Sequence, residues 1–323
     1  MRELFIFIVR EKEMTDYGMK TLKIILQIIF LCFLGAGVAD AAVPIPYDYY
    51  LTAEDAGMVE ERYRPHGMYK PVKVKVSENN PAYGKFTYFA WYPDKLEQSG
   101  QEWPLVILMN GTGVTCDTDE PLYEHLASWG FIVLGNTDTQ TRAGYSAQWG
   151  LEIMENLARD KQSVFYKKID FKNMGIGGHS QGANGAVSAL LKRDMMGRFK
   201  TVVTISGVTT SLMEKLDMEK WDFNPGEISI PWFMVAGDGP IDRKLITPLS
   251  DMESLFEGAK TFVVMGRRGF TTHSDIQAES DAYVTAWFRW QLKDDRYAAR
   301  AFTGKEPEIL ANSGWNHVHI KNR

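Results

Sequence analysis

The chain has 323 residues, of which 45% are hydrophobic and 24% are charged, and its formal net charge is -5. This composition is typical of a globular protein that can bury a large core without disulfides or metals. The mildly acidic balance and the lack of a basic run argue against nucleic acid as a partner.

The first 41 residues have the pattern of a secretory signal peptide. A short basic segment that begins at Met19 precedes an apolar run at 24–34, and small residues follow at 39–41. These are the three parts of a signal, and the apolar run is too short to favour a spanning helix, although an uncleaved N-terminal anchor stays open as the alternative. We therefore expect translation to start at Met19, and residues 42–323 to form one secreted or periplasmic domain without a stable membrane span.

The cysteines indicate how little the fold depends on an oxidising compartment. Cys32 lies in the signal segment, so the mature chain keeps only Cys116, which can form no internal disulfide. We expect Cys116 to be a small apolar packing residue rather than a catalytic thiol.

Strand-like and helix-like segments alternate from about residue 72 onward. Residues 72–76 and 86–92 are expected to form an antiparallel pair, because turn-forming residues lie between them at 79–84. Further strands are predicted at 104–109, 131–134, 174–177, 201–205, 231–236 and 261–265, and helices at 120–129, 147–157, 183–191, 249–256 and 282–292. This alternation predicts a single α/β domain with a mostly parallel central sheet and helices on both faces.

The chemistry of the chain is suggested first by Gly178, Ser180 and Gly182, which are spaced as G-x-S-x-G. The motif lies between a predicted strand and a predicted helix. A serine at such a sharp turn is exposed above the sheet, and glycines on either side let the backbone pass closely. The following helix directs its N-terminal N–H groups toward the serine, where negative charge develops during acyl transfer. We therefore predict Ser180 to be a nucleophile.

A serine hydroxyl needs a base, and in this arrangement the base comes late in the chain, after an acid. His273 lies in a loop after the last predicted strand and before the last predicted helix, and it is the expected base. The other five histidines lie in regions that do not suit this role. These are His66, His125, His179, His317 and His319. The side chain of His179 is expected to point away from the nucleophile, and the last two histidines are expected to lie in a solvated tail.

The acid is expected in the loop after the strand predicted at 231–236. Asp242 and Asp238 compete for this role. Asp238 lies very close to the strand end, whereas Asp242 leaves room for the chain to turn toward the histidine. We favour Asp242 and keep Asp238 as the alternative. A carboxylate beside the imidazole would fix its tautomer and stabilise the imidazolium.

An oxyanion hole requires two N–H donors that point at the developing negative charge. One is expected from Gln181, the residue after the nucleophile. The other is expected from the flexible loop after residues 104–109, where we assign Thr112 and keep Gly113 as the alternative. This chemistry uses no metal and no organic cofactor, so neither is predicted.

With these residues placed, the chain resembles the cutinase-like and polyesterase-like branch of the α/β-hydrolases, which includes chlorophyllase-like and dienelactone-hydrolase-like esterases. The resemblance covers roughly residues 72–292 and depends on the segments 110–113, 124–131, 178–182 and 273–275. It implies the α/β-hydrolase fold without a large lid, and a serine esterase that acts through an acyl-enzyme.

The chain also departs from this family. Residues 206–210 lack the tryptophan that polyester-cleaving members carry there, the C-terminal disulfide of that group cannot form, and the nucleophile is serine rather than the cysteine of dienelactone hydrolases. The segment 206–230 is too short for a lid domain, which predicts an open site suited to exposed or polymeric esters. Trp221 and Phe223 could line an acyl groove or serve in ordinary packing.

The expected function is therefore an exported carboxylic ester hydrolase whose substrate is a small-molecule or polymeric ester. Two alternatives stay open. A serine peptidase or an acyltransferase could use the same triad, since the acyl-enzyme is common to all of them. A catalytically inactive binding protein on a hydrolase fold is the other alternative, although the complete set of Ser180, His273 and an aspartate argues against it.

Overall fold

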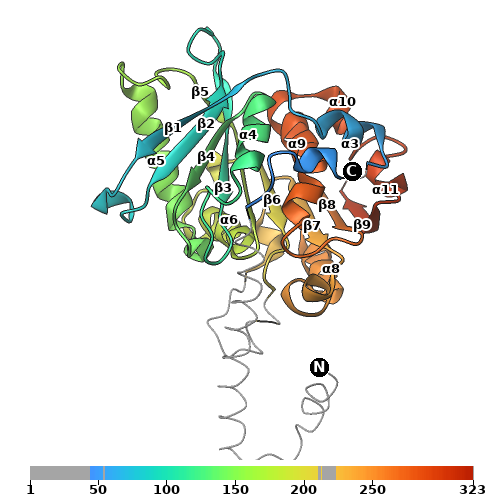
Figure 1. Cartoon of the computed structure of the whole chain (residues 1–323). Helices are drawn as coiled ribbons and strands as arrows, with labels where there is room; N and C mark the ends of the chain where they lie inside the picture. The colour runs from blue at the N-terminus through green and yellow to red at the C-terminus, as the bar shows by residue number, and fades with distance from the viewer. Residues whose placement is uncertain (1–43, 54, 210–211, 213–222, 323) are drawn as a thin grey trace, which may run out of the picture.

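The computed structural model describes residues 44–53, 55–209, 212 and 223–322. In Figure 1 these residues form one central sheet with helices packed on both of its faces. The α/β class predicted from the alternation of segments is therefore confirmed. The predicted signal segment 1–41, including Met19, lies outside the described residues.

The sheet is mixed, with a parallel centre and antiparallel edges. Its strand order is β1-β2-β4-β3-β5-β6-β7-β8-β9. Neighbours from β4 to β8 pair in parallel, and the pairings β1–β2, β2–β4 and β8–β9 are antiparallel. The strands are β1 (Pro71–Ser77), β2 (Tyr88–Pro93), β3 (Trp103–Met109), β4 (Ile132–Asn136), β5 (Ile169–His179), β6 (Thr201–Ile205), β7 (Trp232–Gly237), β8 (Val263–Arg268) and β9 (Trp315–Lys321).

The helices form a layer on each face of the sheet. Helices α5, α6 and α8 contribute to one apolar cluster, and α3, α4, α9, α10 and α11 contribute to the other. They are α3 (Met58–Tyr63), α4 (Glu120–Ser128), α5 (Tyr145–Arg159), α6 (Gln181–Lys192), α8 (Leu249–Gly258), α9 (Ile276–Lys293), α10 (Arg296–Ala299) and α11 (Glu308–Ala311). Short 3-10 turns are η1 (Tyr49–Leu51), η2 (Pro81–Tyr83), η3 (Thr141–Ala143), η4 (Met196–Arg198) and η5 (Pro225–Glu227), and η6 (Asp242–Ile246) is a π-helical turn.

Continuous apolar runs in the central strands supply both cores at once. Successive side chains of a strand point to opposite faces. In β3, Leu105 and Ile107 therefore enter the cluster beneath α5 and α6, while Val106 enters the cluster beneath α4 and α9. In β7, Trp232 and Phe233 are divided between the clusters in the same way. A strand buried on both faces needs such a run, which is why these strands could be predicted.

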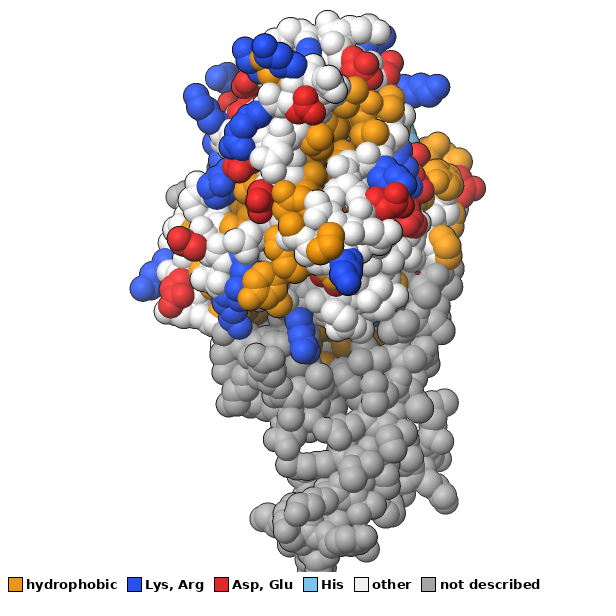
Figure 2. All heavy atoms as spheres, turned by 90° about the vertical axis from the view of Figure 1, so that its left-hand side faces the viewer, with side chains coloured by type: hydrophobic (Ala, Val, Ile, Leu, Met, Phe, Trp, Pro, Cys, Tyr) orange, Lys and Arg blue, Asp and Glu red, His pale blue; other side chains and the backbone are white. Residues whose placement is uncertain are grey.

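The β1 edge of the sheet is partly open. Figure 2 shows a band of apolar side chains on this side of the molecule, with Lys, Arg, Asp and Glu side chains around it. The alternate residues Val72, Val74 and Val76 of β1 are half-buried against the core, and Lys73 and Lys75 between them are more open to solvent. Lysines on an edge strand disfavour pairing with another sheet.

The C-terminal part of the chain corrects one prediction. The segment that holds His317 and His319 was expected to be a solvated tail, but it forms β9, which pairs antiparallel with β8. Its burial is slight, because β9 is an edge strand that holds mainly half-buried and exposed residues. Helix α9 also begins earlier than residue 282, since its first turns bury Ile276 and Ser280.

Candidate active site

Ser180 occupies a strained turn between β5 and α6. Its backbone angles are φ 55° and ψ -124°, a left-handed conformation that residues with a side chain rarely adopt. Such strain costs about 1–3 kcal/mol and is concentrated at functional sites. The turn is held by the Ser180 N–H, which donates to the Ile205 carbonyl at 2.8 Å, and the serine itself is only 7% exposed.

The glycines of the G-x-S-x-G motif are required by close backbone packing. A Cβ atom at Gly178 would lie 2.4 Å from the Gly182 carbonyl oxygen. A Cβ atom at Gly182 would lie 2.0 Å from the Met109 carbonyl oxygen at the end of β3. Real Cβ contacts are not this short, so any larger residue would force the first turn of α6 away from the sheet. The motif therefore fixes the position of the serine above the strand ends.

The structure brings His273 and Asp242 together. His273 lies in the loop between β8 and α9, and its Nδ1 is 2.6 Å from Asp242 Oδ1. The Asp242 side chain is fully buried, and its Oδ2 accepts hydrogen bonds from Ser206 Oγ at 2.6 Å and from the Gly237 N–H at 3.0 Å. Burial raises the pKa of Asp242, but the hydrogen bond and charge of His273, with the Ser206 bond, outweigh it and hold the pKa below its ordinary value.

Asp238 is directed elsewhere. Its carboxylate lies 3.5 Å from Arg243 Nε and 3.9 Å from Arg267 Nε, and its N–H donates to the Arg268 carbonyl. Of the two aspartates considered from the sequence, Asp242 is therefore the one that contacts His273. The path of the loop decides this, because the π-helical turn η6 begins at Asp242 and aims its carboxylate inward.

His179 ties the loop of His273 to the turn that holds Ser180, a contact that was not predicted. Its Nε2 is 2.8 Å from the His273 carbonyl oxygen, and the two imidazole rings lie 4.5 Å apart between centroids. Burial, followed by the charge of His273, lowers the pKa of His179 to about 3, so this ring stays neutral. His179 precedes Ser180 directly, and its contact therefore holds the His273 loop beside the serine.

The Ser180 hydroxyl itself makes no hydrogen bond to His273 in the described part of the chain. Catalytic hydrogen bonds of this kind are often long without substrate and tighten when substrate binds. The His179 side chain nevertheless links the two segments, because it extends from the Ser180 turn to the His273 carbonyl oxygen. The structure thus pairs an imidazole with a carboxylate and links the loop of His273 to the turn that holds Ser180.

The loop after β3 lies against the start of α6. Gln181 Nε2 donates to Thr112 Oγ1 at 2.6 Å, which brings the two predicted oxyanion residues together. The Gly113 N–H already donates to the Thr139 carbonyl, whereas the Thr112 N–H has no partner among the described residues. Thr112 is therefore the better donor of the two alternatives. The Gln181 N–H belongs to the first turn of α6, where N–H groups have no intrahelical acceptor.

Asn110 fixes the start of this loop, a role that was not predicted. Its side-chain nitrogen donates to the carbonyls of Asn136 and Asp138, each at 2.8 Å, and the residue is only 2% exposed. An asparagine directly after a buried strand was visible in the sequence, but nothing there identified its partners. The bonds join the loops after β3 and β4, and this stabilises the backbone around Thr112.

Cys116, later in the same loop, is buried and belongs to the apolar cluster beneath α4 and α9. Burial is the main cause that raises the pKa of its thiol. A thiol held in its neutral form is a poor nucleophile. The prediction that Cys116 is a packing residue is confirmed.

Asp119 is the last residue of the loop between β3 and α4, and the titration of its carboxyl group tests how deeply this loop is buried. Burial raises its pKa from 3.8 to about 7, and the residue is 6% exposed. Because the folded-state pKa lies above the unfolded one, the stabilisation from this group is complete below about pH 4 and is lost as the pH rises through 7. We expect Asp119→Asn to raise the free energy of unfolding at pH 8 by about 4 kcal/mol and to change it little at pH 4. Urea titrations at both pH values measure this, and an unchanged value at pH 8 would contradict the raised pKa of the buried carboxyl.

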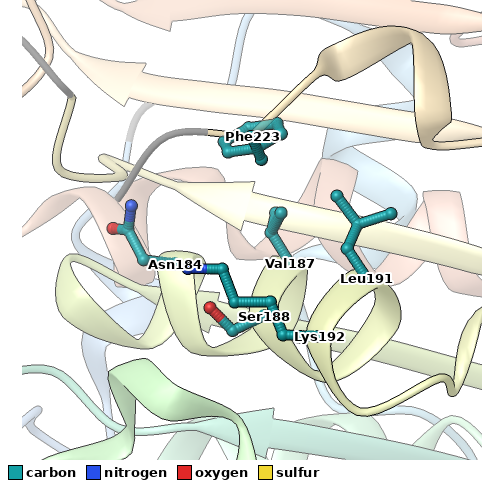
Figure 3. Close-up of a pocket in the computed structure, with 6 residues that line it drawn as sticks. All are labelled: Asn184, Val187, Ser188, Leu191, Lys192 and Phe223. Carbon is teal, nitrogen blue, oxygen red and sulfur yellow. The ribbon is translucent and has the colours of Figure 1, made fainter. Parts of the chain in front are cut away.

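An apolar hollow begins one turn beyond Ser180. Val187 and Leu191 of α6 point toward Phe223, as Figure 3 shows, and Asn184, Ser188 and Lys192 complete the lining of this small hollow. A larger neighbouring hollow, open to solvent, extends to Ala183, Gly207 and Val208. Phe223 also lies 6.1 Å from the Trp232 ring, between centroids. Trp221, the other predicted groove residue, lies outside the described residues.

The described residues contain no group of three or more His, Cys, Asp or Glu side chains arranged to hold a metal ion. None of the helices in this part of the chain combines the length and apolar character needed to cross a bilayer. The chain matches no model of a known protein family, and no curated protein matches it. The site must therefore be interpreted from its own geometry.

Proposed function

We propose that the chain has the α/β-hydrolase fold and is a serine esterase that hydrolyses carboxylic esters. A single observation carries this proposal: Ser180 is held in a left-handed turn at the head of α6, and the preceding His179 contacts the backbone of His273, whose imidazole is joined to Asp242 at 2.6 Å. A sharp strand-to-helix turn flanked by glycines is the position that the nucleophilic serine takes in α/β-hydrolases. Export to the periplasm or the medium is proposed from residues 1–41 alone.

The order of the groups along the sheet supports the same fold. The nucleophile follows β5, the acid follows β7 and the base follows β8, and these three strands are parallel. Carboxyl ends of parallel strands meet at one edge of a sheet, where open α/β sheets bind their ligands. The chain order Ser, Asp, His is the one that α/β-hydrolases use.

The proposed acylation step begins with Ser180 and His273. His273 Nε2 takes the proton from Ser180 Oγ as Oγ bonds to the ester carbonyl carbon. Asp242 accepts the Nδ1–H bond and stabilises the imidazolium that forms. The tetrahedral intermediate then breaks its bond to the alcohol oxygen, which receives the proton from His273. The products are a free alcohol and an acyl group on Ser180.

Deacylation follows the same route with water in place of the alcohol. His273 takes a proton from water, the water oxygen bonds to the acyl carbon, and Ser180 Oγ leaves with the proton returned by His273. In both steps the carbonyl oxygen becomes negatively charged. The N–H groups of Gln181 and Thr112 are proposed to stabilise it, and the loss of one such donor typically lowers kcat by about 100- to 1000-fold.

The hollow beyond Ser180 is proposed to hold the acyl group. It includes Ala183 on the first turn of α6, it is largely apolar, and it opens to solvent. An open, apolar hollow suits esters with a hydrophobic acyl chain and places no closed wall around the rest of the substrate. Small-molecule and polymeric esters both fit this description.

Hydrolysis of p-nitrophenyl esters by the purified protein tests the proposal. We expect turnover of the acetate and butyrate esters, and a dependence on acyl length that reflects the hollow. Peptide p-nitroanilides test the peptidase alternative, and added alcohols as acceptors test the acyltransferase alternative. Turnover of amides in preference to esters, or transfer in preference to hydrolysis, would contradict an esterase. No turnover of any substrate would favour an inactive binding protein.

A further inference from the structure

Ser206 is a second serine in a left-handed backbone conformation, at the end of the strand next to β5. It follows β6 directly, its φ is 44°, and its side chain is fully buried. Its N–H donates to the Val235 carbonyl at 2.7 Å, which fixes the residue between β6 and β7. Glycine adopts this conformation without strain, whereas serine does so at a cost in free energy. A serine at this position is therefore explained only if its side chain makes a specific contact.

The Ser206 hydroxyl makes such a contact, with the carboxylate of Asp242. Its Oγ lies 2.6 Å from Asp242 Oδ2, while Asp242 Oδ1 faces His273. An ionised carboxylate can only accept, so Ser206 donates this bond. The Gly237 N–H points at both oxygens, 3.0 Å from Asp242 Oδ2 and 3.3 Å from Ser206 Oγ. Each carboxylate oxygen therefore has its own donor, and rotation of the carboxylate would break both sets of bonds.

Arg267 holds the loop that carries this carboxylate. The guanidinium is 1% exposed and donates to the Gly237 carbonyl from Nε and Nη2 and to the Thr247 carbonyl from Nη1, at 2.6–3.1 Å. These two carbonyls lie on either side of Asp242 in the chain. Arg267 therefore holds the backbone of the loop between Gly237 and Thr247 at both ends. The Asp242 side chain can then move only by rotation about its own bonds.

We propose that Ser206 is a positioning residue of the active site, which orients the Asp242 carboxylate toward His273 and acts on catalysis only through that carboxylate. This inference rests on the proposed function and adds a fourth group to the series Ser180, His273 and Asp242. A misaligned carboxylate would fix the imidazole tautomer less well, and the loss would appear in the chemical step. Substrate binding does not involve Ser206, because its side chain is fully buried.

Ser206→Gly is the informative variant, because it removes the hydroxyl and relieves the left-handed strain at the same time. We expect a melting temperature close to that of the wild type, because the relieved strain offsets the lost hydrogen bond, with kcat lower by about 10- to 100-fold and an unchanged KM. Ser206→Ala should lose as much kcat but keep the strain. Ser280→Ala is the matched control, since it removes another fully buried serine hydroxyl, on α9, and should leave kcat unchanged.

A double-mutant cycle with Asp242→Asn separates positioning from a general structural effect. If Ser206 acts through the carboxylate, Ser206→Gly should lower kcat in the wild type but not in the Asp242→Asn background. An equal loss in both backgrounds would overturn the proposal, and so would full activity of Ser206→Gly. The cycle presupposes that the wild type hydrolyses esters, and a wild type without turnover counts against the proposed function instead.

A readout without turnover keeps the inference independent of activity. The proton between His273 Nδ1 and Asp242 Oδ1 should give a low-field NMR resonance in the wild type. We expect this resonance to shift or to be lost through exchange in Ser206→Gly, and to be unchanged in Ser280→Ala. An identical resonance in the wild type and in Ser206→Gly would contradict a positioning role for Ser206.

Discussion

Replacing Ser180 with alanine is expected to lower kcat for ester hydrolysis by about 10⁶-fold, because it removes the attacking oxygen. The activity that remains would come from the oxyanion donors and from substrate binding. Alanine keeps the backbone conformation and fills nearly the same volume, so the free energy of unfolding should hardly change. Ester turnover and urea unfolding of the same preparations measure both quantities.

Ser250→Ala is the matched control for this prediction, because Ser250 is an exposed serine on α8. It should retain wild-type turnover. Ser180→Gly makes a further distinction: it should be as inactive as Ser180→Ala but more stable by about 1 kcal/mol, since glycine tolerates φ 55° without strain. Ester turnover by Ser180→Ala at more than one hundredth of the wild-type rate would contradict Ser180 as the nucleophile.

Replacing Asp242 with asparagine is the second large effect, with an expected loss of about 10⁴-fold in kcat. Asparagine matches aspartate in size, but its amide can present a donor to His273 Nδ1 and so favour the wrong imidazole tautomer. KM should change little, because Asp242 is fully buried and has no access to substrate. Steady-state kinetics on one soluble ester separates these two parameters.

Asp238→Asn provides the control, because Asp238 lies earlier in the same loop and contacts arginines instead of His273. Its kcat should stay within a few-fold of the wild type. If Asp238→Asn lost activity by thousands-fold and Asp242→Asn did not, the acid would be misassigned. The lowered pKa of Asp242 also means that its carboxylate stabilises the fold above about pH 4 and less as the pH falls, a contribution that Asp242→Asn should remove.

Much of the fold could be predicted because the central strands are buried on both faces. In a chain where helices and strands alternate, a short apolar run such as residues 104–109 strongly favours a strand of this kind. The edge strand β9 could not be predicted in this way, since its residues alternate weakly and many of them face solvent. The early start of α9 was also missed, because its first turns bury Ser280 and Asp281, polar residues that suggest a loop.

The groups of the candidate site could be predicted only as far as local pattern and chain order specify them. The glycines around Ser180 and the position of His273 between a strand and a helix were visible in the sequence. The choice between Asp242 and Asp238 depends on the path of one loop, and the sequence left it open. Ser206 was missed because a lone serine after a buried strand has no distinguishing pattern; only its φ and its bond to Asp242 reveal it.

Covalent labelling with a fluorophosphonate tests the central claim most directly, because the probe reacts with an activated serine and needs no knowledge of the natural ester. Intact-mass and peptide mass spectrometry of the full chain would count and locate the adducts. We predict one adduct per chain, on Ser180, absent from Ser180→Ala and much slower in Asp242→Asn. A wild-type protein that stays unlabelled, or an adduct on another residue, would contradict the account.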